Sequence, residues 1–158
     1  MKGNEQVIAR LNETLIDEFT AIHQYFIHAE MEENWGYKKL ASYVKRQSID
    51  EMKHAEKLIE RILFLDGVPS MGELKPLSIG QDVKAQLEND LQLEYNAVQN
   101  LNRCIAEARD AGDNGSRELF EIILRDEEDH VDWLETQLQT IADIGIGLYL
   151  AQHLEPGE

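Results

Sequence analysis

Six acidic and imidazole side chains stand at positions where a helical stripe is otherwise apolar. They are Glu18, Glu51, His54, Glu94, Glu127 and His130. Two Glu-x-x-His pairs occur among them, and a spacing of three residues puts both side chains on one face of a helix. Each pair follows another of these glutamates by 33 residues. Carboxylate and imidazole ligands suit iron or manganese, and Zn²⁺ also accepts them.

The whole pattern occurs twice, with an offset of 76 residues. Asp50-Glu51-Met52-Lys53-His54 corresponds to Asp126-Glu127-Glu128-Asp129-His130. Four carboxylates buried together would repel one another strongly unless cations or protons compensate them. Two divalent cations would neutralise them, and so would two ferric ions that share an oxide. The repeat therefore predicts a dinuclear metal site, and the structural alternative is a set of buried salt bridges and hydrogen bonds.

Proline and glycine divide the chain into long helical segments. The prolines fall at 69, 76 and 156, and Gly36, Gly67, Gly112 and Gly145 each follow a long stretch without glycine, as helix-ending glycines do. Runs of alternating β-branched residues are absent, so an all-α fold is predicted. The expected helices cover residues 5–34, 38–66, 82–111 and 117–144, with a short apolar segment at 146–154.

Connection lengths predict how these helices are arranged. Residues 35–37 and 112–116 are short connections, so each joins an antiparallel pair of helices. Residues 67–81 are long enough to run the length of a bundle. We expect a ferritin-like four-helix bundle of two antiparallel hairpins with one long crossover and a short fifth C-terminal helix. The whole chain, 1–158, is expected to form one domain.

Composition excludes several classes of function. The chain has 15 basic and 31 acidic residues and a formal net charge of −16, which disfavours nucleic acid and anionic lipid as partners. The one cysteine, Cys104, leaves no internal disulfide and is expected to be a buried small apolar residue. No secretory leader or membrane-spanning run is visible, so a cytoplasmic protein is expected.

The residues of the two half-sites resemble the di-iron site of the bacterioferritins. The segments 48–56 and 126–135, the start Met1-Lys2-Gly3 and the stretch Asn34-Trp35-Gly36 are also similar to that family. The resemblance covers nearly the whole chain. It implies a shell of 24 identical subunits built from two-fold dimers, oxidation of Fe(II) with O₂ or peroxide, and storage of ferric iron inside. A small ferredoxin that releases iron is a further partner of the family.

The resemblance also implies a role for each ligand. Glu51 and Glu127 would bridge two iron ions, and the terminal ligand pairs would be Glu18 with His54 and Glu94 with His130. Tyr25 lies on the same stripe as Glu18, where it would hydrogen bond or carry a radical, or else pack in the core. Asp50 and Asp126 would orient the ligand histidines or would be solvated.

Met52 lies about 100° around the helix from Glu51 and so points off the metal face. The simplest interpretation is that Met52 makes a flexible apolar contact. The resemblance implies instead that Met52 and its copy in a second subunit bind haem b between them. Phe19, His23 and Phe26 would flank that pocket, and His23 offers a competing ligand.

One departure from the family concerns an iron site on the inner surface. Some relatives carry His and Glu where this chain has Arg46 and Gln47, and only Asp50 of that site remains. Two other histidines, His28 and His153, show no partner in the sequence and are expected at the surface. Asp50 alone is left as a candidate inner-surface ligand.

Two other functions compete with ferroxidase and iron storage. A rubrerythrin-like peroxidase usually adds a four-cysteine domain, and this chain has one cysteine and no spare length. In a haem-carrying structural protein the carboxylates would form salt bridges, and no reaction would be catalysed. Loss of Fe(II) oxidation on Glu127→Ala, with the assembly intact, would separate the ferroxidase from the structural protein.

Overall fold

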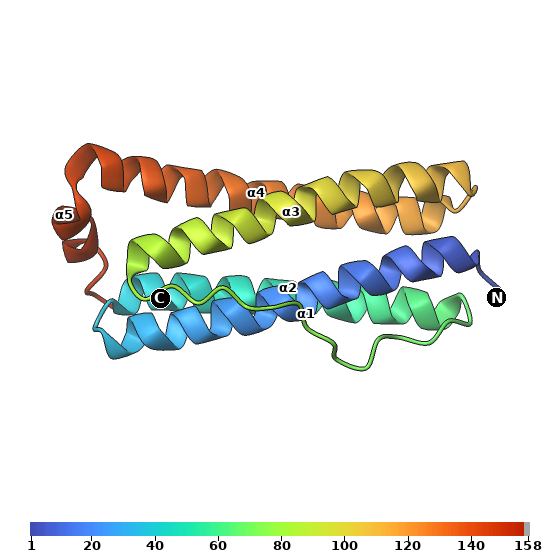
Figure 1. The fold of residues 1–158 in the computed structure, drawn as a ribbon, viewed down its shortest axis with the longest axis horizontal. Coiled ribbons are helices and arrows are strands. Elements are labelled where there is room, and N and C mark those ends of the chain that lie inside the picture. Colours follow the sequence, from blue (N-terminus) through green and yellow to red (C-terminus); the bar gives the residue numbers. More distant parts are fainter. Residues whose placement is uncertain (157–158) are drawn as a thin grey trace.

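Four long helices and one short helix make up the structure. The computed structural model describes residues 1–156, and it contains α1 (Glu5–Asn34), α2 (Lys38–Phe64), α3 (Val83–Asp110), α4 (Asn114–Ile144) and α5 (Ile146–Ala151). No strand occurs among these residues. Antiparallel α1 and α2 form one hairpin, α3 and α4 form the other, and the two hairpins pack together lengthwise (Figure 1). This confirms the predicted fold class.

Side-chain caps explain where three of the helices begin. Asn4 accepts a hydrogen bond from the Val7 backbone N–H at 3.1 Å, and Asp82 caps α3 in the same way. Asp113 caps α4 by accepting from Ser116 N–H at 2.9 Å. Helix α4 therefore begins three residues earlier than the sequence predicts. The remaining helix bounds agree with the prediction to within three residues.

The end of α2 differs in detail from the prediction. Gly36, Gly112 and Gly145 have positive φ angles, as expected for glycines that end helices, but Gly67 does not. The left-handed position after α2 is Asp66, with φ of 60°. Gly67 is needed for a different reason, because a Cβ there would lie 2.8 Å from Cγ2 of Ile8.

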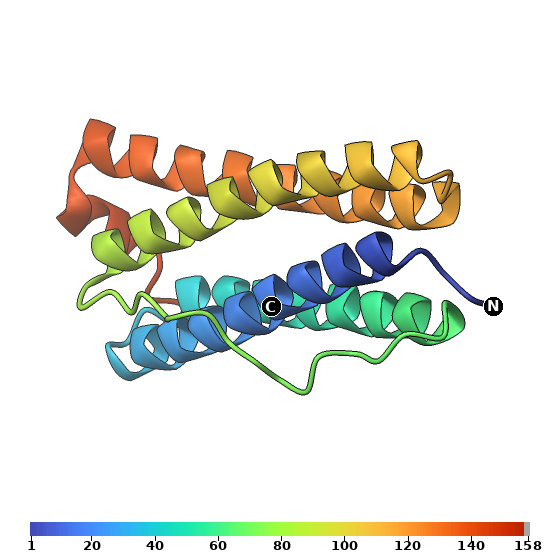
Figure 2. The same cartoon turned by 45° about the vertical axis from the view of Figure 1, so that its right-hand side comes forward.

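The long crossover between α2 and α3 runs along α1 (Figures 1 and 2). Polar side chains of α1 hold it by hydrogen bonds to its backbone. Ser70 N–H donates to Asn12, Lys75 N–H donates to the Thr20 hydroxyl and Ser78 N–H donates to Gln24. The side chains that receive the crossover lie one or two helical turns apart. A connection without secondary structure is thereby fixed against the bundle.

The interior consists of two apolar clusters with a polar layer between them. One cluster, around Leu11, Leu58 and Phe120, fills the end of the bundle that holds the N-terminus. The other, around Leu40 and Leu134, fills the end that carries α5. Within residues 1–156, no helix combines the length and hydropathy that a membrane span requires.

Candidate metal centre

The polar layer contains the six residues singled out in the sequence. All six side chains are buried, with relative exposures from 0% to 7%, and they come from all four long helices: Glu18 (α1), Glu51 and His54 (α2), Glu94 (α3), Glu127 and His130 (α4). Each helix brings its residues there because they continue its buried stripe. The structure thus brings together all the ligands that the spacing predicts.

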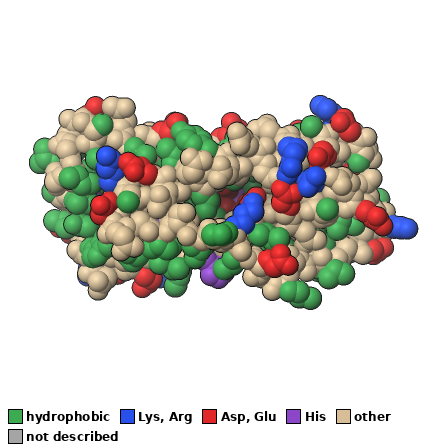
Figure 3. All heavy atoms as spheres, in the orientation of Figure 1, with side chains coloured by type: hydrophobic (Ala, Val, Ile, Leu, Met, Phe, Trp, Pro, Cys, Tyr) green, Lys and Arg blue, Asp and Glu red, His purple; other side chains and the backbone are tan. Residues whose placement is uncertain are grey.

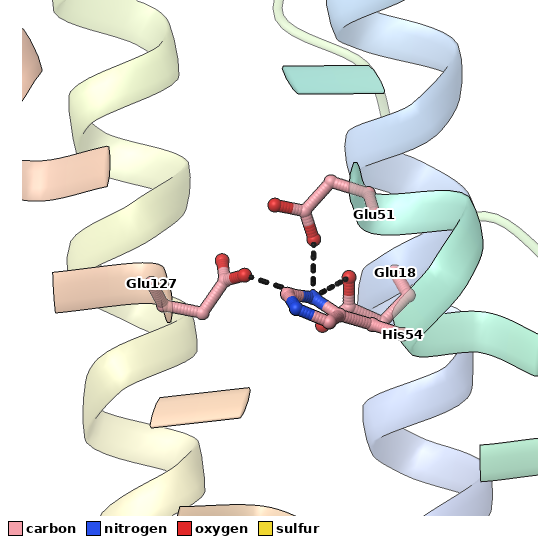
Figure 4. Close-up of side chains that lie close together, drawn as sticks. All are labelled: Glu18, Glu51, His54 and Glu127. Atoms are coloured by element: carbon pink, nitrogen blue, oxygen red, sulfur yellow. Dashed lines mark ion pairs between the residues drawn. The ribbon is translucent and has the colours of Figure 1, made fainter. Parts of the chain in front are cut away.

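One half of the centre is gathered around His54. Its Nδ1 atom lies 3.2 Å from Oε1 of Glu127, 3.4 Å from Oε2 of Glu51 and 3.5 Å from Oε2 of Glu18 (Figure 4). The three carboxylates converge on this nitrogen from α1, α2 and α4. One oxygen or nitrogen from each of the four side chains lies within 4.8 Å of the others, which is close enough to bind one ion together.

The other half is gathered around His130. Its Nδ1 atom lies 3.0 Å from Oε1 of Glu51, 3.4 Å from Oε1 of Glu94 and 4.0 Å from Oε1 of Glu127. These four side chains form a second group that could hold a metal ion. Glu51 and Glu127 belong to both groups, whereas the other four residues each belong to one. The geometry therefore offers two adjacent cation positions with two carboxylates between them.

The buried polar atoms of the centre lack ordinary partners. Among the described residues, Oε2 of Glu18, both oxygens of Glu51 and Oε1 of Glu127 form no hydrogen bond, and neither does Nδ1 of His54 or His130. Buried polar groups without hydrogen bonds are costly, and a cation would satisfy all of these atoms together. The donor set of oxygens and imidazole nitrogens fits iron, manganese or zinc.

In the metal-free centre, bound protons offset the negative charge of the carboxylates. Burial and the neighbouring charge of Glu51 raise the pKa of Glu18 well above its usual value, and burial with the same charge raises the pKa of Glu127. Burial by itself would lower the pKa of the histidines. Their close ion pairs with the carboxylates outweigh it and raise the pKa of His54 to about 11 and that of His130 to about 10.

Glu51 behaves in the opposite way, since its carboxylate lies among these proton donors. Burial raises its pKa, but its close contacts with Glu18 and the two imidazoles more than compensate and lower the pKa well below the usual value. In the metal-free centre the shifts therefore favour protonated imidazoles, and protons on Glu18 and Glu127, around an ionised Glu51.

Tyr25 contacts the centre directly. Its buried hydroxyl donates a hydrogen bond to Oε1 of Glu94, and its ring lies edge-on to the His130 ring with a centroid distance of 6.5 Å. Burial and the charge of Glu94 raise the pKa of the phenol well above 10. The phenol therefore stays protonated and holds one oxygen of this carboxylate.

The two aspartates beside the Glu-x-x-His pairs are placed differently. Oδ2 of Asp126 lies 2.8 Å from Nε2 of His54 and accepts a hydrogen bond from it. This bond orients the ring so that Nδ1 faces the carboxylates. Asp50 is exposed, and the structure does not bring it to either histidine. Both aspartates line a pocket of about 540 Å³ that reaches the centre at His54 and His130.

The surroundings of that pocket bear on the inner-surface iron site. Arg46 and Gln47, where the sequence departs from the family's pattern, both line it. Gln47 is buried, and Arg46 lies over the ring of Tyr43 at 5.6 Å from its centroid. Asp50 thus shares the pocket with a cation and an amide, and also with the carboxylates of Asp126 and Asp129.

Met52 lies outside the metal centre, as its position on the helix predicts. It is 53% exposed on α2, one helical turn from Ile49, which is 44% exposed. Phe26 on α1 is 49% exposed. His23 is also exposed, and its Nδ1 donates to the Phe19 carbonyl at 2.7 Å, which leaves Nε2 free of that bond.

The prediction that His28 lies at the surface is wrong. Its side chain has 0% exposure, Nδ1 donates to Oδ1 of Asp90 at 2.9 Å, and Nε2 accepts from Gly80 N–H at 3.0 Å. Gln24 donates to the same Asp90 oxygen at 2.8 Å. His153 is also not free at the surface, because its ring lies 4.4 Å from the Tyr149 ring, centroid to centroid. Cys104 is buried, as predicted.

The sequence carried weak signals for the residues that were missed. Gln24, His28 and Glu32 recur every fourth position along α1, a polar line beside the apolar stripe. Such a line is typical of a solvated face as well as of a buried network. Only the crossover, whose Gly80 backbone covers His28, makes it a buried one.

Comparison with known proteins agrees with this fold. The family model described as a ferritin-like domain matches residues 8–144. The chain therefore belongs to the ferritin-like family.

Its relatives narrow the assignment. The bacterioferritin of Mycolicibacterium paratuberculosis is 45% identical over 152 residues, which are 96% of each chain. The bacterioferritin of Streptomyces coelicolor is 45% identical over 155 residues, 98% of this chain and 93% of that one. The bacterioferritin of Brucella melitensis is 43% identical over 158 residues, 100% of this chain and 98% of that one. Within the ferritin-like family the chain is thus a member of the bacterioferritins.

Proposed function

We propose that this protein is a ferroxidase that stores iron. The single observation that carries the proposal is the pair of four-residue groups that share Glu51 and Glu127 inside the bundle. Buried, unpartnered oxygen and nitrogen atoms at both positions support a site for two cations. Similarity to bacterioferritins over nearly the whole chain supports iron as the cation.

The proposed reaction takes Fe(II) as substrate. Two Fe(II) ions each lose one electron, and O₂ accepts both electrons and two protons and leaves as hydrogen peroxide. With peroxide as oxidant, the same two electrons and two protons produce two molecules of water. Open metal positions toward the pocket at His54 and His130 give the oxidant access.

Each residue has a proposed part in this reaction. Glu51 and Glu127 bridge the two ions, which holds the ions at a distance suited to joint two-electron transfer. His54 and His130 each bind one ion through Nδ1. Asp126 fixes the orientation of His54, and second partners of this kind strengthen ligand binding.

Glu18 and Glu94 complete the two terminal positions in this proposal. Tyr25 hydrogen bonds to one Glu94 oxygen, which leaves the other free for the cation. Because Tyr25 is also the oxidisable group nearest this half of the centre, it is placed to donate an electron when only one Fe(II) is present. Asp50 is a weaker candidate for passing iron onward, since only it remains of the inner-surface ligands seen in relatives.

Storage requires a closed assembly, which we propose to be a 24-subunit shell built from two-fold dimers. The support is the membership in the bacterioferritins together with apolar side chains exposed on α1, α2 and α5, among them Phe26, Met52 and Leu148. Haem b bound by Met52 at the two-fold interface fits the exposed thioether, and it would supply a route for electrons. A small ferredoxin would then deliver electrons for iron release.

The test of the proposed function is an aerobic Fe(II) titration of the metal-free protein. We expect oxidation of two Fe(II) per chain in a fast phase and retention of far more iron than two per chain in solution. Glu127→Ala should abolish the fast phase, whereas Glu128→Ala, one residue away and exposed, should leave it intact. Fast oxidation at the unaltered rate in Glu127→Ala would rule out the assigned centre.

Haem binding has its own test. The protein is titrated with haem b, and absorbance reports the axial thioether ligand. Met52→Leu should remove that signal while the ferroxidase phase remains, because Met52 lies off the metal face. His23→Leu tests whether the competing ligand, His23, binds the haem. A spectrum that changes with His23→Leu and not with Met52→Leu would assign the haem to the imidazole.

A further inference from the structure

A second pocket lies on the opposite seam of the bundle from the one that reaches the two histidines. It has a volume of about 190 Å³ and lies between α1, α3 and the crossover. Asp17, Gln24 and Leu93 line it, and each of them adjoins in sequence a residue of the centre or its tyrosine. The pocket therefore opens beside the carboxylates that α1 and α3 contribute, whereas the first pocket lies over α2 and α4.

The charged groups of this pocket form one ion pair. Asp17 is the one acidic and Lys75 the one basic side chain among the residues that line it. Nζ of Lys75 pairs with Oδ1 of Asp17, and Nδ2 of Asn100 donates to the other Asp17 oxygen at 3.3 Å. The other walls carry amide and hydroxyl groups, such as those of Asn96 and Ser78. The lysine ammonium is thus a tethered cation on a carboxylate in a polar pocket.

The attachment of Lys75 allows its side chain to move without the crossover. Its backbone N–H is hydrogen bonded to the Thr20 hydroxyl at 3.0 Å, and Ser78 N–H to Gln24 at 3.1 Å, so the chain on both sides of the pocket is anchored. The Lys75 side chain is 54% exposed and that of Asp17 is 17% exposed, so the ammonium can turn toward solvent while the carboxylate stays in the pocket. On the face that carries the crossover, a basic side chain lies over a hollow near the middle of the molecule with acidic atoms beside it (Figure 3).

We propose that this pocket is an access route for divalent cations to the metal centre, and that Lys75 closes it by competing with the cation for Asp17. Asp17 attracts a cation once the ammonium leaves, and the amide oxygens around it replace part of the hydration shell. Glu18 follows Asp17 on α1 and Glu94 follows Leu93 on α3, so their buried carboxylates lie on the helices that form this pocket, as does Asp90, which accepts a hydrogen bond from Gln24. This inference rests on the proposed function, because it assigns a route to the same centre.

Stopped-flow binding of Co²⁺ to the assembled, metal-free protein tests the route without any redox step. Lys75→Met should speed Co²⁺ association about tenfold at low ionic strength, because the freed Asp17 charge then acts on a divalent ion at about 6 Å through water. Asp17→Asn should slow it by a similar factor. Lys57→Met is the matched control, since Lys57 forms an exposed ion pair with Glu60 away from both pockets. The differences should shrink at high salt.

A double variant separates competition from a general effect of charge. With Asp17→Asn in place, Lys75→Met should lose most of its gain, because no carboxylate is left for the lysine to block. Full additivity of the two changes would overturn the competition. So would an unaltered or slower rate in Lys75→Met, or a rate that responds only to Asp129→Asn at the other pocket.

The equilibrium stoichiometry distinguishes failure of the route from failure of the centre. Binding of about two Co²⁺ per chain in every variant, with the rate differences above, supports the route. Two Co²⁺ per chain with identical rates would overturn the route and leave the proposed centre standing. Binding of no Co²⁺ by the unaltered protein would overturn the centre and the route together.

Discussion

Metal binding should displace protons from the centre near neutral pH. In the metal-free centre the pKa values of His54 and His130 are raised to about 11 and about 10, so both imidazoles are protonated at pH 7. The pKa values of Glu18 and Glu127 are raised as well, which adds to the number of protons held. A bound ion needs ionised carboxylates and neutral imidazoles, so two divalent cations replace at least about two protons per chain.

The same exchange determines how affinity depends on pH. One proton per ion makes the affinity for each ion change about 10-fold per pH unit, or about 1.4 kcal/mol, while the pH lies below the raised pKa values of the histidines. Protons held by Glu18 and Glu127 make the dependence steeper. Affinity rises with pH, because a higher pH removes the competing protons.

Calorimetry with Co²⁺ measures this exchange directly. The observed binding enthalpy is compared in buffers with different ionisation enthalpies at pH 7, and the slope gives the number of protons released. Glu128→Gln, which changes an exposed carboxylate beside the centre, should leave the slope unaltered. Release of fewer than about one proton per ion would refute the protonated metal-free centre.

The stability of the metal-free protein should follow the same protons. A histidine with a raised pKa contributes stability in full below its ordinary pKa of 6.5, and the contribution disappears as pH rises through about 10 to 11. The raised pKa of Glu18 acts in the same direction, because the unfolded chain loses that proton at lower pH than the folded chain. The denaturation midpoint of the metal-free protein should therefore fall from pH 6 to pH 9, and Co²⁺ should remove most of that fall.

Three other substitutions have separable outcomes. Asp126→Asn should weaken Co²⁺ binding at one of the two positions by about 10-fold to 100-fold, because Asp126 orients His54. Asp129→Asn should leave the affinity unaltered, and equal Co²⁺ isotherms for the two variants would contradict the orienting role of Asp126. Tyr25→Phe should lower the free energy of unfolding by about 1–3 kcal/mol, measured with urea, because a buried carboxylate oxygen loses its donor; an unaltered midpoint would count against that bond. His28→Ala should cost about 1–3 kcal/mol and His23→Ala almost nothing in the same assay, since only the former takes a hydrogen-bond donor from the buried Asp90.

Much of the fold was predictable from local patterns. Apolar periodicity and glycine spacing predicted the four long helices, and the connection lengths predicted two hairpins with one crossover. The predictions that were wrong in detail concern backbone conformations that more than one type of residue can adopt. At the end of α2, Asp66 takes the left-handed conformation, while Gly67 is required by its close approach to Ile8.

The composition of the candidate centre was also predictable, because burying carboxylates on an apolar stripe is costly. The repeat at an offset of 76 residues identified the six side chains that the structure gathers in one layer. It could not show that the two halves differ. In the structure Asp126 reaches His54, whereas the corresponding Asp50 remains exposed and reaches neither histidine.

The sequence by itself determined which side chains must face the interior, since helical periodicity puts them on the buried stripe whatever the partners are. Only the tertiary structure decided what surrounds them. The crossover buries His28 beneath Gly80, which lies 52 residues further along the chain. It also brings Lys75 to Asp17, from which it is separated by 58 residues. Such contacts depend on where a connection without periodicity settles on the bundle, and hydrogen bonds that form only after the helices pack determine that position.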